Sequence, residues 1–64
     1  MLPLRISVAM CTYNGARYLP AQLQSIAAQI RQPDELVICD DKSDDATVSI
    51  AQDFARSAPF PVRI

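Results

Sequence analysis

With 64 residues, half of them apolar, the chain can form one small domain or part of one. Its formal net charge is −1 and it holds only two Tyr and two Phe, so it lacks the basic stripe and the stacking surface of a nucleic-acid-binding protein. No apolar run approaches the roughly 20 residues that a membrane-spanning helix needs. We therefore expect a cytoplasmic protein without a membrane-spanning segment and without a nucleic-acid partner.

The first predicted element is a strand from Arg5 to Cys11. Within it Ile6, Val8 and Met10 alternate with small residues, and neither set is strongly polar. This pattern is typical of a strand that is buried on both sides, so we expect both of its faces to be covered.

A turn over residues 12–15 follows, and its Gly15, the chain's only glycine, is predicted to adopt a positive φ. From Tyr18 to Ile30 apolar residues recur at intervals of three and four, which predicts a helix. Pro20 is compatible with this helix because it falls in the first turn. The predicted inward stripe consists of Leu19, Leu23, Ile26, Ala27 and Ile30.

The second predicted strand, Glu35 to Cys39, runs directly into a cluster of carboxylates. Four of the seven acidic residues of the chain fall within residues 40–45. We expect Ser43 to cap the next helix through its hydroxyl. Asp44 and Asp45 are expected in the first turn of that helix, where they favour the positive end of its dipole.

The remaining residues predict a second helix and the opening of a third strand. Val48, Ala51, Phe54 and Ala55 form the inward stripe of this helix, which is expected to end around residues 57–59. Residues 61–64 then have the pattern of a strand.

The element order predicts an α/β fold with a parallel βαβαβ sheet. Its short connections favour right-handed crossovers, as in the nucleotide-binding half of a doubly wound, Rossmann-like fold. Three strands and two helices leave one sheet edge exposed and one face thinly covered. Residues 1–64 are therefore expected to be the N-terminal part of a single larger domain, apparently truncated.

The two cysteines are predicted to be reduced thiols in the core. Cys11 and Cys39 each lie in an apolar run and lack the C-x-x-C spacing of a metal or redox site. If the two runs form neighbouring parallel strands, the thiols could lie close enough to pair under oxidation.

Polar side chains follow both strands at the point where each strand ends, with Thr12, Tyr13 and Asn14 in one loop and Asp40 and Asp41 in the other. Parallel strands bring such loops together at one edge of the sheet. A small pocket there could bind a pyrimidine nucleotide, because a tyrosine ring offers a face for the base and a carboxylate can accept its imide N–H. The alternative is structural, with Tyr13 packed on the helix, Asn14 in an Asx turn and the acids solvated.

Several other sites are excluded by the letters. A calcium-binding EF-hand loop that begins at Asp41 would need Gly at Ala46 and Glu at Gln52. The glycine fingerprints of dinucleotide-binding and P-loop proteins are absent, and without His the chain has no Ser-His or Cys-His nucleophile pair. A non-catalytic nucleotide-binding module, or a receiver-like module that binds Mg2+ through Asp40 and Asp41, remains the alternative function.

Three stretches together resemble a known family. They are Ile6-Ser7-Val8-Ala9-Met10-Cys11-Thr12-Tyr13-Asn14-Gly15, the helical residues Tyr18, Leu19, Gln22, Leu23, Ser25 and Ile26, and Cys39-Asp40-Asp41-Lys42-Ser43-Asp44-Asp45-Ala46-Thr47. They are similar to the N-terminal end of the family 2 glycosyltransferases, which have a GT-A fold. The Cys-Thr-Tyr-Asn-Gly form is similar to that of members resembling rhamnosyltransferases that build bacterial surface polysaccharides.

The resemblance implies that this segment holds the nucleotide half of the donor site. Tyr13 would stack on the pyrimidine base, Cys11 would approach it, and Asp41, either alone or together with Asp40, would bind its imide nitrogen. Thr12 and Asn14 would shape the loop. Two residues depart from the usual pattern of the family, namely Cys11 in place of Pro or Thr and Lys42 in place of Gly.

The same resemblance implies a UDP- or dTDP-sugar donor, a glycan or lipid-linked acceptor, and a location in the cytoplasm or at the inner membrane face. The D-x-D metal motif of the family lies on a later strand and its catalytic base lies beyond Ile64, and residues 40–45 contain no D-x-D spacing. We therefore expect no catalytic residue and no metal ligand within this chain. Mn2+ or Mg2+ is implied for the full enzyme only, and the segment alone is not expected to catalyse transfer.

Overall fold

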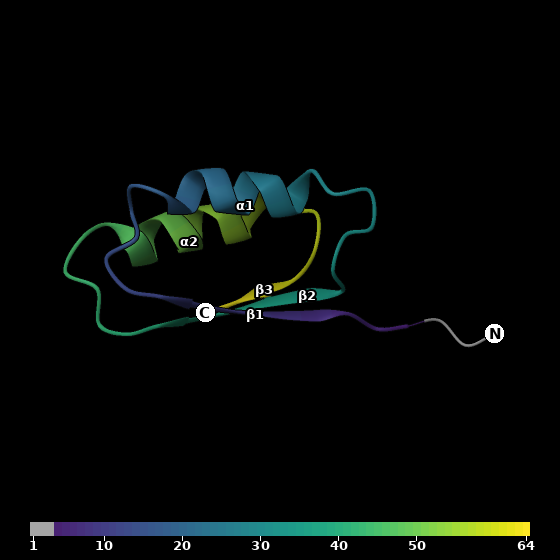
Figure 1. Cartoon of the computed structure of the whole chain (residues 1–64), viewed down its shortest axis with the longest axis horizontal. Helices are drawn as coiled ribbons and strands as arrows, with labels where there is room; N and C mark the ends of the chain where they lie inside the picture. The colour runs from purple at the N-terminus through teal and green to yellow at the C-terminus, as the bar shows by residue number, and fades with distance from the viewer. Residues whose placement is uncertain (1–3) are drawn as a thin grey trace.

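The computed structural model describes residues 4–64, in which strands and helices alternate along the chain (Figure 1). The elements are β1 (Ser7–Thr12), α1 (Leu19–Ala27), β2 (Glu35–Asp40), α2 (Thr47–Ser57) and β3 (Val62–Arg63). All strand pairs are parallel and the strand order is β1-β2-β3. The predicted parallel βαβαβ sheet is confirmed, although β3 pairs through only two residues.

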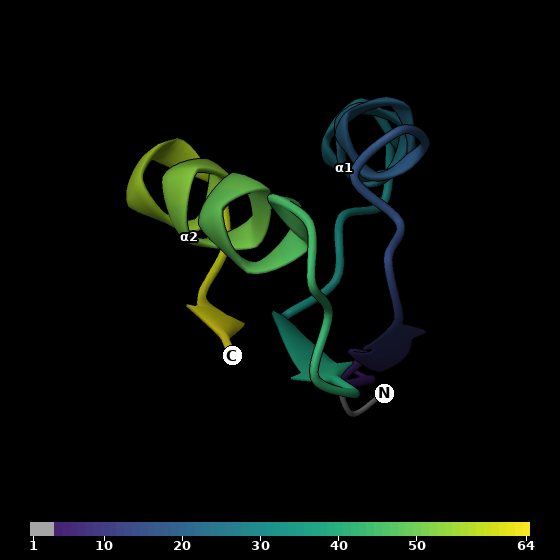
Figure 2. The same cartoon turned by 90° about the vertical axis from the view of Figure 1, so that its left-hand side faces the viewer.

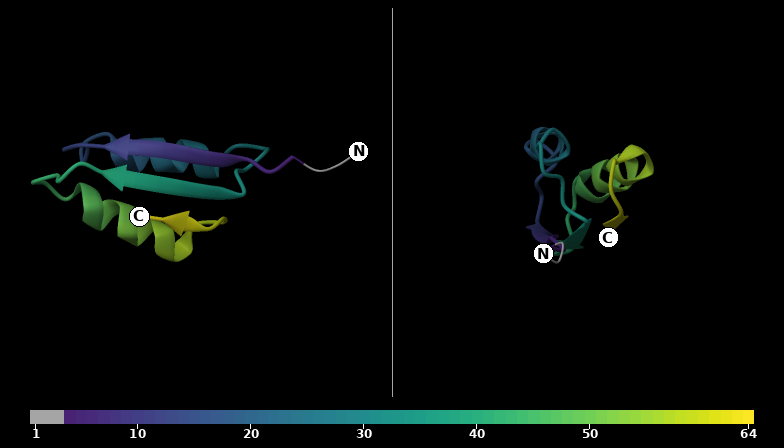
Figure 3. Two further views of the ribbon diagram at one scale, coloured as in Figure 1. Left: turned by 90° about the horizontal axis from the view of Figure 1, so that it is seen from below. Right: turned by 90° about the vertical axis from the view of Figure 1, so that its right-hand side faces the viewer.

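Both helices lie on the same face of the sheet (Figure 2; Figure 3, right). This follows from the strand order, because crossovers of one hand that advance in one direction place every connecting helix on the same side. The expectation that both faces of β1 are covered is therefore wrong for the part of the chain that the structure describes. Val8, Met10 and Thr12 face the helices, whereas the alternating Ser7 and Ala9 are exposed.

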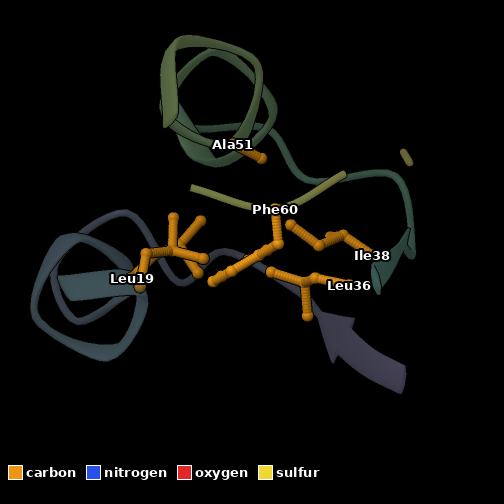
Figure 4. Close-up of a cluster of buried hydrophobic side chains, with 6 residues drawn as sticks. Leu19, Leu36, Ile38, Ala51 and Phe60 are labelled. Atoms are coloured by element: carbon orange, nitrogen blue, oxygen red, sulfur yellow. The ribbon is translucent and has the colours of Figure 1, made fainter. Parts of the chain in front are cut away.

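The core lies between the sheet and the two helices (Figure 4). Leu36 and Ile38 project from the central strand β2, two residues apart, onto this face. The apolar faces of the two helices pack against these side chains. The ring of Phe60 lies beside that of Phe54 in α2, with 6.1 Å between the two ring centroids. The fully enclosed apolar residues are Leu19, Leu23, Leu36, Ile38, Ala51 and Phe60.

Helix α1 begins at Leu19, with Pro20 in its first turn, but it ends earlier than the apolar spacing predicts. The side-chain amide of Gln32 donates to the carbonyl of Ala27 at 2.9 Å, which satisfies one of the free carbonyls at the helix end. Ile30 therefore lies beyond the helix and is fully exposed. Its predicted place in the inward stripe is wrong.

Cys11 and Cys39 lie opposite each other on β1 and β2, on the face that the helices leave open. Both thiols are free and exposed, so the prediction that they belong to the core is wrong for the described residues. The condition for their proximity, neighbouring parallel strands, is met. Pairing under oxidation stays a prediction.

Replacement of Leu36 by Ala should lower the free energy of unfolding by about 2–5 kcal/mol, because it leaves a cavity at the centre of the core. Denaturant titration of the full-length protein at neutral pH measures this change. Ile30→Ala is the matched control and should change stability by no more than about 0.5 kcal/mol, since Ile30 has no packing to lose. Equal effects of the two substitutions would contradict the observed end of α1.

Candidate functional site

The candidate site is formed by two loops that leave the carboxyl ends of β1 and β2 side by side (Figure 1; Figure 3, left). The parallel register places Thr12 opposite Asp40, the last residues of the two strands. The Thr12 hydroxyl donates to Oδ1 of Asp40 at 2.6 Å, and the backbone N–H of Asp41 donates to the Thr12 carbonyl at 2.9 Å. Sheet pairing thus continues directly into side-chain contacts between the loops.

The Asp40 carboxylate is the centre of this network. The hydroxyl of Ser43 donates to Oδ1 at 2.6 Å, and the backbone N–H of Ser43 donates to Oδ2 at 2.8 Å. The Ser43 hydroxyl, then the Thr12 hydroxyl and the Ser43 N–H, hold the pKa of Asp40 below its ordinary value, because each donor favours the charged form. Asp40 is therefore an anion at neutral pH with its oxygens turned toward the protein.

Ser43 is not the N-cap of α2, contrary to the prediction. The N-cap position is Ala46, which has no side-chain acceptor, and Asp45 takes over part of the capping role. Oδ1 of Asp45 accepts the backbone N–H of Thr47 at 3.0 Å and also the Thr47 hydroxyl. Asp44 and Asp45 thus precede the first turn of the helix instead of lying within it. The hydroxyl of Thr47 is the main cause of the lowered pKa of Asp45.

Four further hydrogen bonds join the two loops, and we call this set the loop zipper. It consists of Asn14 N–H to Ser43 Oγ (2.8 Å), Asp44 N–H to Asn14 Oδ1 (2.7 Å), Gly15 N–H to Thr47 Oγ1 (2.9 Å) and Ala16 N–H to Asp45 Oδ2 (3.2 Å). Asn14 therefore bonds across to the second loop with both its backbone and its side chain. Its observed bonds are not those of the local Asx turn that the structural alternative supposed.

Backbone conformation in the loops differs from the prediction. Gly15 does not have a positive φ; the positive values belong to Asn14 (46°) and Lys42 (54°). Asn tolerates the left-handed region better than most residues, and here its backbone N–H donates a hydrogen bond to the hydroxyl of Ser43. Lys42 has no such tolerance, which makes its position the strained point of the second loop.

Tyr13 and Asp41 are the predicted site residues that the network leaves exposed. Tyr13 is 63% exposed and is not part of the core, so it does not match the alternative in which its ring is packed away. Within residues 4–64 the Asp41 carboxylate accepts no hydrogen bond from the protein. The site therefore presents one aromatic face and one unpaired carboxylate at adjoining strand ends.

Of the remaining predicted residues, Thr12 and Asp40 are more enclosed, whereas Cys11 and Asn14 are exposed. Thr12 is buried under the loops, Asp40 is half-buried, and Cys11 is exposed on the open face of the sheet. The described residues form no pocket, so the expected small pocket is not made by this part of the chain alone. The two loops form an open edge.

No group of three or more His, Cys, Asp or Glu side chains within residues 4–64 is arranged to hold a metal ion. The carboxylates of Asp40 and Asp45 accept hydrogen bonds from different partners, Thr12 and Ser43 for the first and Ala16 and Thr47 for the second. Among the described helices none has the length and apolar character that crossing a membrane requires.

Thr47, the residue that the sequence reasoning overlooked, is completely buried and joins both loops to α2. In the sequence, a Thr at the first position of a helix and two residues after an Asp only weakly indicates such a connecting role. Its role depends on the N–H of Gly15, which is 32 positions away in the chain.

Comparison with known proteins decides the family. A model of glycosyl transferase family 2 matches residues 7–64, which span both loops and every strand and helix. The chain belongs to this family. Glycosyltransferase family 2 was the family that the two loop motifs resemble, and its GT-A fold agrees with the parallel βαβαβ sheet.

Two curated relatives of this family 2 chain are named as glycosyltransferases. A Bacillus subtilis protein, EpsE, whose name marks it as a provisionally assigned glycosyltransferase, is 41% identical over 51 residues, or 80% of the chain. An uncharacterized glycosyltransferase of Nostoc sp. is 35% identical over 60 residues, or 94% of the chain. The chain spans only 18% and 19% of the lengths of these relatives. No solved structure matches it significantly.

Replacement of Thr47 by Val should lower the free energy of unfolding by about 1–3 kcal/mol, because it removes the acceptor of the partly buried Gly15 N–H without a change of shape. Thr47→Ser keeps the hydroxyl and is the matched control. Denaturant titration compares the two variants. A Ser variant as unstable as the Val variant would show that the methyl group, and not the hydroxyl, is required.

Replacement of Lys42 by Gly should raise the free energy of unfolding by up to about 1 kcal/mol, because Gly adopts a positive φ without the steric cost that Lys has. Lys42→Ala is the control, since it removes the charge but keeps the cost. Equal gains from Lys42→Gly and Lys42→Ala would assign the effect to charge.

Gly15→Ala should be tolerated, because a methyl group there meets open space.

Proposed function

We propose that the two loops form the donor-nucleotide subsite of a sugar-nucleotide-dependent glycosyltransferase. The observation that supports this is the pair of exposed groups, the Tyr13 ring and the unpaired Asp41 carboxylate, at the carboxyl ends of adjacent parallel strands. Ligands of open α/β sheets bind at such strand ends. Membership of glycosyltransferase family 2 supports a sugar nucleotide as the general class of donor.

The chemistry of the two groups favours a pyrimidine base. The Tyr13 ring can stack on a base of any kind, whereas a carboxylate that only accepts hydrogen bonds is matched by the imide N–H of uracil or thymine. We therefore propose a UDP- or dTDP-sugar as the donor. Cys11, Thr12, Asn14 and Asp40 complete the proposed subsite as residues that approach the base or shape the loops around it.

For the full enzyme we propose transfer to a glycan or lipid-linked acceptor in bacterial surface polysaccharide synthesis, on the cytoplasmic side of the membrane. Displacement at the sugar carbon requires a base that deprotonates the acceptor hydroxyl. The described residues contain no group of His, Cys, Asp or Glu side chains arranged to hold a metal ion. We propose that the catalytic base and the ligands of Mn2+ or Mg2+ lie outside this chain.

The alternative, a receiver-like module that holds Mg2+ through Asp40 and Asp41, has less support. It requires both carboxylates to turn toward one cation, as Mg2+ is usually held by carboxylates and water. Both oxygens of Asp40 instead accept hydrogen bonds from Thr12 and Ser43.

Titration of the full-length protein with UDP and dTDP tests the proposal. Asp41→Ala and Tyr13→Ala should each weaken binding by on the order of tenfold, because one removes a charged hydrogen-bond acceptor and the other a stacking face. Asp44→Ala is the matched control: it removes an exposed carboxylate from the same loop and leaves the zipper bond of its backbone N–H in place. Unchanged affinity in both Asp41→Ala and Tyr13→Ala would overturn the proposal.

A further inference from the structure

We propose that Asp40 is a positioning residue: it holds the two loops in the arrangement that presents Asp41 and Tyr13 to the base, and does not itself touch the nucleotide. This inference rests on the proposed function and refines it. It separates two adjacent carboxylates that the sequence cannot tell apart. The separation follows from what each carboxylate contacts.

The acceptor capacity of Asp40 is largely used within the protein. A carboxylate has about four acceptor positions. Three of these positions are occupied here, by the hydroxyls of Thr12 and Ser43 at 2.6 Å each and by the Ser43 N–H at 2.8 Å. Asp41, the next residue, is exposed and accepts no hydrogen bond within the described residues. The carboxylate that is free to accept from a ligand is that of Asp41.

The same bonds determine where Asp41 lies. Both the backbone N–H and the hydroxyl of Ser43 donate hydrogen bonds to the Asp40 carboxylate. The side chain of Asp40 therefore closes a turn over residues 40–43, with Asp41 and Lys42 at its centre. Lys42 has a φ of 54° in this turn, a conformation that costs a lysine free energy and that the surrounding contacts must maintain. Loss of the Asp40 contacts would allow the turn to relax and Asp41 to leave its place.

Asp40 also acts on the loop that carries Tyr13. Asp40 accepts a hydrogen bond from the hydroxyl of Thr12, the residue before Tyr13. Ser43 accepts one from the backbone N–H of Asn14, the residue after Tyr13. Tyr13 is thus held on both sides by groups that bond to Asp40 directly or through Ser43. A single carboxylate therefore sets the relative position of the aromatic face and the free carboxylate.

The test compares the affinities of the full-length protein for UDP and CDP, measured by calorimetry. Cytosine lacks the imide N–H of uracil and has an acceptor at that ring position, so the ratio of the two affinities reports the carboxylate that contacts the base. Asp41→Asn should weaken UDP binding by about tenfold or more and abolish the preference for UDP. Asp40→Asn should weaken UDP binding by about 3–10-fold and lower the ratio, because Asp41 is no longer held in place. In the Asp41→Asn background the same substitution should weaken binding of UDP and CDP by an equal factor.

A second pair of variants shows whether Asp40 acts through its protein partners. Thr12→Val removes the hydroxyl donor to Asp40 without a change of shape. If the two residues act as a unit, the double variant with Asp40→Asn should bind UDP no more weakly than the weaker single variant. Additive losses would contradict the proposal, as would a preference for UDP that survives Asp41→Asn and is lost only when Asp40 is also replaced.

Amide hydrogen exchange without nucleotide keeps this test separate from that of the proposed function. In Asp40→Asn, or in Thr12→Val if the first variant folds poorly, the amides of Asn14 and Asp44 should exchange faster while that of Ile38 in β2 is unchanged. Unchanged exchange at Asn14 and Asp44 would overturn the positioning role. Failure of the unmodified protein to bind either nucleotide would overturn the proposed function and leave the exchange result to decide the role of Asp40 in the loops.

Discussion

The structure depends on the register between β1 and β2, which ends in the hydrogen bond from Thr12 to Asp40. The two strands pair through six successive residue pairs, and Thr12 and Asp40 form the last of them. Because side chains alternate between the faces of a strand, a shift of one residue would turn Asp40 away from Thr12 and Leu36 out of the core. Correct packing of the core and correct assembly of the loops are therefore one and the same condition.

The order and type of the elements could be predicted from the sequence because they are encoded locally. The intervals of Leu19, Leu23 and Ile26 define a helix, and the short apolar runs define strands. The end of α1 could not be predicted, since Ile30 continues the apolar spacing and only the contact of Gln32 with the Ala27 carbonyl shows where the helix ends. Coverage of both faces of β1 was misjudged for a related reason: small residues such as Ser7 and Ala9 are compatible with burial and with exposure.

The candidate site divides in the same way. Tyr13 and Asp41 could be chosen as candidates because they follow the carboxyl ends of two neighbouring parallel strands, where open α/β sheets bind ligands. The actual roles of Ser43, Asp45 and Thr47 could not, because each is defined by a partner in the other loop. The positive φ values show this clearly: local propensity favours Gly15, but the cross-loop bonds of Asn14 and the turn closed by Asp40 place them at Asn14 and Lys42.

The loop zipper has a consequence for how the site comes into being. Its bonds join residues that are 29 to 32 positions apart, so none of them can form before β1, α1 and β2 have closed into a unit. The loss of chain entropy on closure precedes every gain from the zipper. A peptide of residues 40–47 would retain only the local bonds of Asp40 with Ser43 and of Asp45 with Thr47, without any bond to the first loop, and neither loop could be moved alone to another scaffold. The smallest transferable unit is the complete strand-helix-strand segment with both loops attached.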